Sequence, residues 1–176
     1  MIETARLALR RWRDDDVAPF HAMGQDAEVM RHLGPAMSAE DCRATVARQN
    51  AIADAYGRCF FAMERRADAA FLGFCGIKPG PAGTPIAGEP EIGWRLCRAA
   101  WGHGYATEAA RAVLAAEWQR GVNHVAAITV PANARSRAVM ERIGMARVTD
   151  GDFDHPALPP GDPLRRHVLY RIARPA

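Results

Sequence analysis

The stretch from Glu91 to Glu108 constrains the fold of this chain more than any other, because it carries three structural signals in a fixed order. A short β-rich run ends at Leu96, and Gly102 and Gly104 then turn the chain. An Ala-rich segment follows, with apolar residues at positions 106, 110, 113, 114 and 118. The sequence therefore predicts a strand, a glycine turn and the N-terminus of a helix.

The start of this helix is a candidate site for an anion. The first turn of a helix leaves backbone N–H groups without partners and carries the positive end of the helix dipole. A glycine turn that leads into such a helix lets a pyrophosphate approach the backbone closely. We therefore expect an anionic ligand at residues 102–107, although a Gly-x-Gly pattern also serves as a plain turn and cap.

The residues from Trp101 to Ala106 resemble the acetyl-CoA-binding signature of the GNAT family of N-acetyltransferases. That signature reads arginine or glutamine, two residues, glycine, one residue, then glycine or alanine. Trp101 departs from its first position. Tryptophan is common at this position in the branch that acetylates the N-termini of ribosomal proteins. Trp101 therefore indicates a resemblance to this branch in particular.

A second block lies further along the chain and supports the same resemblance. Residues 125–130 are typical of a buried strand, and Asn133, Ser136 and the pair Gly144-Met145 follow it. This order is similar to the second signature of the family, in which asparagine, two residues and serine open a helix that closes on glycine and a bulky apolar residue. Two blocks in family order are far less expected by chance than one glycine loop.

The order of elements agrees with a single GNAT domain over residues 1–176. We expect strands near residues 6–10, 59–64, 71–77, 91–96, 125–130, 146–149 and 167–172, and helices at 14–25, at 38–55, after Gly104 and after Asn133. Ser38, three residues before Asp41, predicts a capped start for the long helix, and Gly57 its end. The resemblance implies an α/β (α+β) fold: a mixed, mostly antiparallel sheet of about seven strands, flanked by about four helices, with the acyl-CoA cleft between two splayed strands.

The resemblance also implies acetyl-CoA as co-substrate and no metal. Trp94 and Leu96 would flank the pantetheine, whose amides pair with the strand edge, and Asn133 resembles the asparagine that binds pantetheine, although a turn residue is equally compatible with that position. We expect Tyr105 to pack and His103 to be a surface residue. The predicted pyrophosphate loop comprises Trp101, Gly102, His103, Gly104, Tyr105, Ala106 and Thr107.

Two side chains are candidates for moving protons. An attacking amine must lose a proton, and a departing thiolate benefits from gaining one. Glu91 stands where family members often place a carboxylate that takes the amine proton, and Ser136 matches the serine that relatives use as proton donor to sulfur. The alternatives are a solvated glutamate at a strand entrance and a serine that only caps its helix.

The segment 150–161 is rich in Asp, Gly and Pro and, in the implied fold, lies near the acceptor. Asp152, Asp154 and His155 are the candidates for binding or deprotonating a cationic amine, and the alternative is a solvated connection. His167 on the last strand is expected to be a packed or edge residue. The sequence leaves open whether Glu91 or a group in this loop is the general base.

Composition limits the other function classes. The net charge is +3, and 22 arginines stand against one lysine, Lys78, without the clustered basic and aromatic residues of a nucleic-acid binder. The N-terminal residues lack the pattern of a signal peptide and no apolar run reaches the length of a membrane span, so a cytoplasmic protein without membrane contact is expected. The cysteines lack metal-ligand spacing and are expected to be reduced, mostly buried thiols: Cys42, Cys59, Cys75 and Cys97.

The predicted function is a direct, acetyl-CoA-dependent transfer of an acetyl group to a primary amine, without a metal or a covalent acyl-enzyme. A protein N-terminus, a polyamine, an amino acid and an antibiotic all fit a pocket built from loops. A CoA-binding sensor that has lost catalysis is the alternative, and an arginine-rich nucleic-acid binder is less favoured. A homodimer is compatible with each interpretation.

Overall fold

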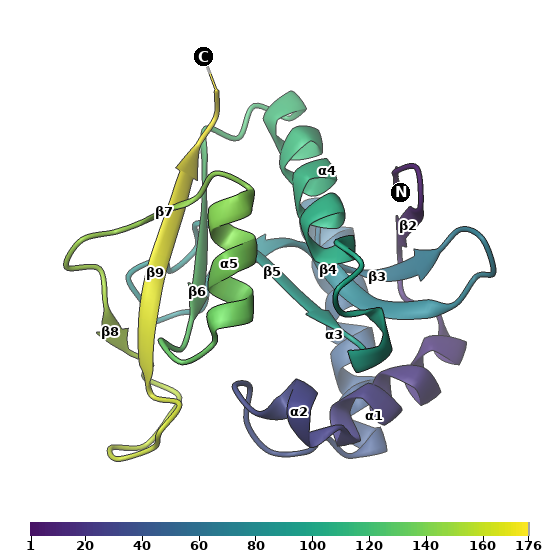
Figure 1. The fold of residues 1–176 in the computed structure, drawn as a ribbon, viewed down its shortest axis with the longest axis horizontal. Helices are drawn as coiled ribbons and strands as arrows, with labels where there is room; N and C mark the ends of the chain where they lie inside the picture. Colours follow the sequence, from purple (N-terminus) through teal and green to yellow (C-terminus); the bar gives the residue numbers. More distant parts are fainter. Residues whose placement is uncertain (176) are drawn as a thin grey trace.

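One open, twisted sheet organises the protein, and the computed structural model describes residues 1–175 of it (Figure 1). The neighbouring strands run in the order β1-β2-β3-β4-β5-β6-β9-β7, and β8 pairs with β9. All neighbouring pairs are antiparallel except β5 and β6. The longer strands are β2 (Leu7–Arg10), β3 (Phe60–Arg65), β4 (Phe71–Pro79), β5 (Pro90–Leu96), β6 (His124–Thr129) and β9 (Arg166–Ala173).

The seven strands and four helices expected from the sequence are present in the described residues, and four short elements add to them. The additions are β1 (Ile2–Glu3), β8 (Phe153–Asp154), the helix α2 (Ala27–Met30) and a 3-10 turn at Arg98–Ala100, while the start of the helix predicted from residue 14 is a 3-10 turn at Asp14–Asp16. Segments of two to four residues are too short to show a hydrophobic period, which is why sequence analysis misses them. The predicted strand at 146–149 is shorter than expected, with β7 covering Ala146–Arg147.

The ends of α1 and α3 agree with the sequence prediction to within one residue. The helices are α1 (Val17–Gln25), α3 (Ala39–Tyr56), α4 (Tyr105–Gln119) and α5 (Ala134–Arg142). Ser38 accepts a hydrogen bond from the backbone N–H of Asp41, whose side chain bonds back to Ser38 N–H, so the predicted cap of α3 is confirmed. Gly57 ends the helix at φ 66°, a left-handed conformation that favours glycine.

The sheet separates two apolar layers. On one face, β2, β3, β4 and β5 pack against α4, with Leu9, Ile77 and Val113 almost fully buried. On the other face, Phe74 and Ala62 pack against α1 and α3. The period of two along a strand explains this separation, because alternate side chains of one strand reach opposite faces.

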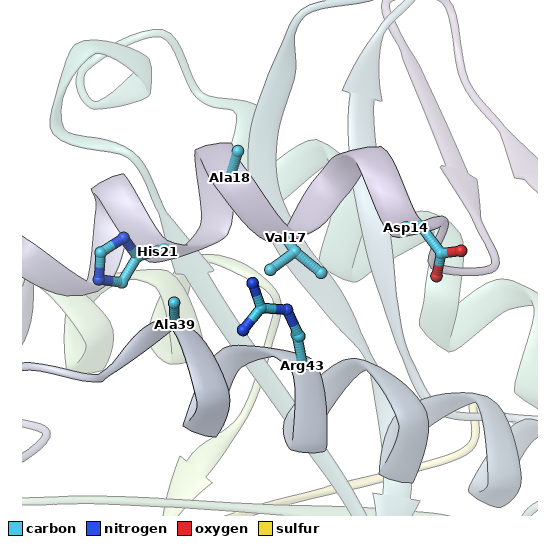
Figure 2. A pocket seen from close by; sticks show the side chains of 6 residues that line it. All are labelled: Asp14, Val17, Ala18, His21, Ala39 and Arg43. Carbon is cyan, nitrogen blue, oxygen red and sulfur yellow. The ribbon is translucent and has the colours of Figure 1, made fainter.

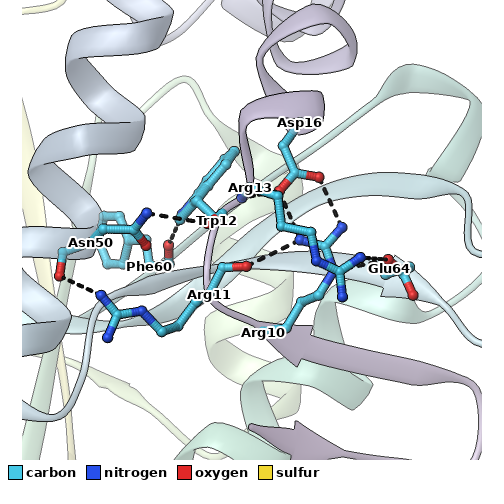
Figure 3. Close-up of polar contacts among 8 residues, drawn as sticks. All are labelled: Arg10, Arg11, Trp12, Arg13, Asp16, Asn50, Phe60 and Glu64. Atoms are coloured by element: carbon cyan, nitrogen blue, oxygen red, sulfur yellow. Dashed lines mark hydrogen bonds and ion pairs between the residues drawn. The ribbon is translucent and has the colours of Figure 1, made fainter.

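A buried ion cluster ties the first strands to the helical layer (Figure 3). Arg10 on β2 donates two hydrogen bonds, of 2.7 and 2.8 Å, to the Asp16 carboxylate before α1, and its Nε donates to Glu64 on β3 at 2.8 Å. Next to it, the Trp12 indole N–H donates to the carbonyl oxygen of Phe60 at 2.6 Å. These contacts position α1 against the sheet.

The parallel pair β5 and β6 is the feature that creates a site. β4 and β5 pair from Gly73 with Leu96 to Pro79 with Pro90, whereas β5 and β6 are paired only at Glu91 and Ala126. Beyond Glu91 the two strands diverge, as Figure 1 shows. Because both strands run in the same direction, the helices that follow them, α4 and α5, begin at the same end of the sheet, where the strands have separated.

Candidate active site

The glycine turn has the conformation that the sequence predicts. Gly102 and Gly104 have φ values of 81° and 78°, in the left-handed region that favours glycine, and Gly104 is the N-cap of α4. The first helical hydrogen bond runs from Glu108 N–H to the Gly104 carbonyl at 3.0 Å. The N–H groups of residues 105–107 therefore precede the helical ladder and are available to a ligand.

An open groove of about 590 Å³ lies beside this turn. Glu108 binds the Arg6 guanidinium, with 2.7 Å from Arg6 Nε to Glu108 Oε2, and Arg111 donates to the Arg142 carbonyl at 2.8 Å. Within residues 1–175, neither Arg111 nor Arg142 forms an ion pair, so the groove carries excess positive charge next to a helix N-terminus. The groove is lined by Arg6, Gly104, Thr107, Glu108, Arg111 and Arg142.

Trp101 holds the corner between β5 and α4. Its indole N–H donates to the Leu96 carbonyl at 3.0 Å, and the Arg135 guanidinium lies 4.2 Å from the centre of its ring. Arg135 is in the first turn of α5, so Trp101 connects the starts of both helices. The tryptophan thus has a structural role at this corner.

The other residues expected around the donor differ in exposure. Leu96 is buried and Trp94 half-buried on the α4 side of the sheet, so both are part of the core packing. Tyr105 is buried, with the Arg6 guanidinium 4.6 Å from its ring centre, and packs as expected, while His103 is exposed. Within the described chain, residues 92–96 of β5 have no strand partner on the β6 side. The backbone N–H and C=O groups along this edge are therefore available to a ligand.

Asn133 and Ser136 lie together at the start of α5. The Asn133 side-chain oxygen accepts from the Ser136 N–H at 3.2 Å, and its amide nitrogen donates to Thr129 Oγ1 at 3.1 Å. Asn133 therefore caps the helix and connects it to the end of β6. The Ser136 hydroxyl forms no hydrogen bond with any described residue, so Ser136 is not the cap and its hydroxyl is free to act on a ligand.

Glu91 lies where β5 and β6 part, and it is not the solvated residue of the alternative interpretation. Its exposed fraction is 8%, and its Oε2 forms an ion pair with Lys78 Nζ on β4. Lys78 and Glu91 are directly opposite each other in the β4–β5 ladder, and Lys78 Nζ lies 5.1 Å from the Phe60 ring centre. Glu91 Oε1 forms no hydrogen bond with the described residues.

The acidic residues of the 150–161 segment already have partners. Asp152 Oδ2 lies 2.7 Å from Arg147 Nη2. Asp154 lies 3.3 Å from Arg165 Nε and 3.4 Å from Arg166 Nη1. Both carboxylates are therefore already paired with arginines that lie close to the loop in the sequence.

His155 has a different environment. Its ring centre lies 5.1 Å from that of His167 and 6.3 Å from that of Phe153. Burial, followed by the positive charges of His167 and Lys78, lowers the pKa of His155 below its ordinary value. His167 packs on Phe153, as expected for a strand residue.

Lys78 on β4 and Arg95 on β5 lie on the strands beside the site but were not singled out from the sequence. Lys78 could have been found from its cross-strand register with Glu91, once the hairpin of β4 and β5 was assumed. Arg95 shares the face of Glu91 and Gly93 through the period of two, a signal that is visible in the sequence. Neither residue stands in a signature block.

Three further observations concern the rest of the described chain. A hollow of about 420 Å³ between α1 and α3, lined by His21 and Arg43 among others, contains none of the predicted residues (Figure 2). Over residues 1–175, no three His, Cys, Asp or Glu side chains come together as a metal site. In the same part of the chain, each helix is too short or too polar to cross a membrane.

Comparisons with known proteins agree with this geometry. The model of the acetyltransferase (GNAT) domain matches residues 6–146. An uncharacterized protein of Bacillus subtilis, YkkB, is 34% identical over 144 residues, which are 81% of this chain and 83% of the relative.

Solved structures share the whole fold. An acetyltransferase of the GNAT family from Bacillus anthracis superposes with a TM-score of 0.79 at 26% identity and covers 98% of this chain and 97% of its own. An acetyltransferase from Salmonella typhimurium that modifies the N-terminal serine of a 50S ribosomal subunit protein has a TM-score of 0.78 at 16% identity, over 98% of this chain and 97% of its own, and this likeness is one of fold. Because the family model matches most of the chain, this protein belongs to the acetyltransferase (GNAT) family.

Proposed function

We propose that the protein is an acetyl-CoA-dependent N-acetyltransferase that transfers the acetyl group directly to a primary amine. The observation that carries this proposal is the combination of an unpartnered β5 edge with a glycine-capped helix N-terminus at its end. Among proteins of the same fold, one is described in complex with coenzyme A and another with acetyl-CoA and AMP. The residues of this chain fit such a ligand in three places.

The first is the phosphate region. The N–H groups of residues 102–107 suit the pyrophosphate, and the guanidinium groups of Arg111 and Arg142 suit a further phosphate in the adjoining groove. The second is the edge of residues 92–96, which can pair with the amides of an extended chain. The third is Asn133 with Ser136, across the opening on α5.

Bound acetyl-CoA supplies an activated acyl thioester, and the protein must orient the amine and handle two protons. Glu91, through its Oε1, accepts the proton that the amine loses as nitrogen bonds to the acetyl carbon. The Ser136 hydroxyl donates a proton to the sulfur as the carbon–sulfur bond breaks. Lys78 positions the Glu91 side chain at the point where the strands part.

A covalent acyl-enzyme is not part of the proposal. Cys97 is the cysteine nearest to the glycine turn in the sequence, and burial raises the pKa of its thiol. A protonated thiol is a poor nucleophile, which supports direct transfer.

On the acceptor side, we assign His155 to contact with the amine or its substituents, because, unlike Asp152 and Asp154, it forms no ion pair with a described residue. Asp152 and Asp154 stay weaker candidates, since a carboxylate that binds arginine has to give up that partner before it binds an amine. Many arginines are likewise paired with acids in the fold, which argues against a free basic surface for nucleic acid.

Two measurements test the function. Calorimetry with acetyl-CoA reports donor binding, and release of free CoA thiol in the presence of a panel of amines reports transfer. Tight binding together with amine-dependent thiol release, and mass-spectrometric detection of the acetylated amine, is the expected result. Binding without release for every amine class would favour the CoA-binding sensor, and no binding would exclude both.

A further inference from the structure

Arg95 has a chemical environment that the proposed reaction does not use. It follows Glu91 at an interval of four residues on β5, so the two side chains share the face that α1, α2 and α3 cover. The Arg95 guanidinium lies 5.5 Å from the ring centre of Phe74. Its Nη1 lies 3.5 Å from the sulfur of Met30 and 3.2 Å from that of Met37.

No carboxylate within residues 1–175 pairs with this guanidinium, and its buried Nε has no hydrogen-bond partner. Two other arginines, Arg58 and Arg171, also have an unbonded buried Nε, but each forms an ion pair with a glutamate. Arg10, which is buried, binds two carboxylates. The half-buried Arg95 thus differs from Arg10, Arg58 and Arg171, because each of those pairs with at least one carboxylate of the described chain.

An unpaired buried cation is destabilising, and thioether sulfur is only a weak acceptor. Burial lowers the pKa of Arg95 to about 10, which leaves the side chain charged at neutral pH. A methionine or leucine would fill this position without the penalty. A desolvated guanidinium with free donors is well suited to an anion, because it can offer charge-assisted hydrogen bonds in a planar fork.

We propose that Arg95 binds a carboxylate of the acceptor, so that the preferred substrate is an amine that also carries an acidic group. This inference rests on the proposed function, because it places the amine near Glu91. Arg95 lies four residues beyond Glu91 on β5, which at roughly 3.3 Å per residue separates their Cα atoms by about 13 Å. The acceptor therefore has its amine and carboxylate separated by several bonds, as in an ω-amino acid or a dipeptide.

The test compares acceptors that differ only in charge. Thiol release is measured with γ-aminobutyrate, ε-aminohexanoate and glycylglycine, and with the carboxamide of each. The wild-type protein is expected to show a kcat/KM about 10–100-fold higher for the acids, the range that one charge-assisted pair provides. Arg95→Met should remove this preference, mainly through KM, without changing the KM for acetyl-CoA, and Arg95→Lys should keep part of it.

Arg98→Met is the matched control. Arg98 lies three residues away, is largely exposed and pairs with Asp26, so its loss should leave the acid preference intact. Thermal unfolding shows whether Arg95 contributes to stability, and so distinguishes substrate recognition by Arg95 from a structural role. If Arg95 binds substrate, Arg95→Met should keep or raise the Tm while losing the preference; a lowered Tm with the preference retained overturns the inference.

A second measurement does not depend on turnover. Calorimetry on the protein saturated with CoA uses the N-acetylated acids and their N-acetylated carboxamides as product probes. Tighter binding of the acids in wild type but not in Arg95→Met supports the inference even if every amine fails to release thiol, in which case the proposed function alone fails. Thiol release with equal efficiency for acids and amides, or equal binding of both probes, overturns the inference and leaves the acetyltransferase proposal standing.

Discussion

The substitution Gly104→Val tests the donor site directly. Gly104 has φ 78°, and a left-handed conformation costs a residue with a Cβ about 1–2 kcal/mol. A Cβ at this position would lie 3.7 Å from Arg6 Nη2, an ordinary contact, so the loss of stability should stay close to that backbone cost. For a chain of this length, about 1–2 kcal/mol lowers the Tm by about 2–8 °C.

The effect on acetyl-CoA is expected to be larger than the effect on stability. The branched side chain covers the N–H groups of residues 105–107, and the loss of one hydrogen bond to a charged phosphate costs about 1.5–3 kcal/mol. The Kd for acetyl-CoA should therefore rise by roughly 10–100-fold. Calorimetry measures the Kd, and thermal unfolding without ligand measures the strain.

Gly57→Val is the matched control. Gly57 has φ 66° at the end of α3, and a Cβ there would meet nothing within 4 Å. It carries a similar backbone strain away from the glycine turn, so its Tm should fall similarly while the Kd for acetyl-CoA is unchanged. A Kd for Gly104→Val within threefold of the Gly57→Val value, roughly 0.6 kcal/mol, would refute the assignment of the pyrophosphate to this turn.

Three further predictions address the proton-handling groups and the buried ion cluster. Ser136→Ala should lower kcat while the Kd for acetyl-CoA stays unchanged, because a proton donor to sulfur acts as the thiolate leaves; an unchanged kcat would remove this role. Glu91→Gln should depress kcat and flatten the acidic limb of the rate profile, whereas His155→Ala should raise the KM of the amine. The pKa of His155 is lowered, so its imidazole is neutral above its ordinary value near 6.5; if His155→Ala alone removed an acidic limb below that pH, His155 would be the base in place of Glu91. Asp16→Asn should cost about 3–5 kcal/mol in chemical denaturation, because it leaves Arg10 buried with one partner fewer, while Asp54→Asn at an exposed pair should cost about 0–1 kcal/mol; equal losses would contradict the burial argument.

The sequence by itself determined the elements whose causes are local. The capping box at Ser38 and the left-handed glycines at 57, 102 and 104 act on backbone groups a few residues away, so pattern and chemistry were enough to place them. The strand, glycine turn and helix from Glu91 onward were confirmed for the same reason. The assignment to a family followed from two such local blocks.

Only the tertiary structure decided how the site residues are used. The sequence showed Asp152 and Asp154 as available acids, but the fold pairs them with arginines that lie up to twelve residues away in the chain. It also decided against the alternative of a solvated Glu91, since this side chain is buried opposite Lys78. Such pairings depend on strand register, which is set by contacts across the sheet.

The partial burial of Arg95 without a counter-ion is the clearest example of a property that the sequence did not predict. Its alternation with Glu91 was readable, yet an arginine in a strand is ordinarily exposed or paired. Met30, Met37 and Phe74 come from three other segments, and only their convergence around the guanidinium removes its water without supplying an acid. Local sequence determines which groups are present and how the backbone turns, whereas desolvation is a property of packing and exists only in the folded chain.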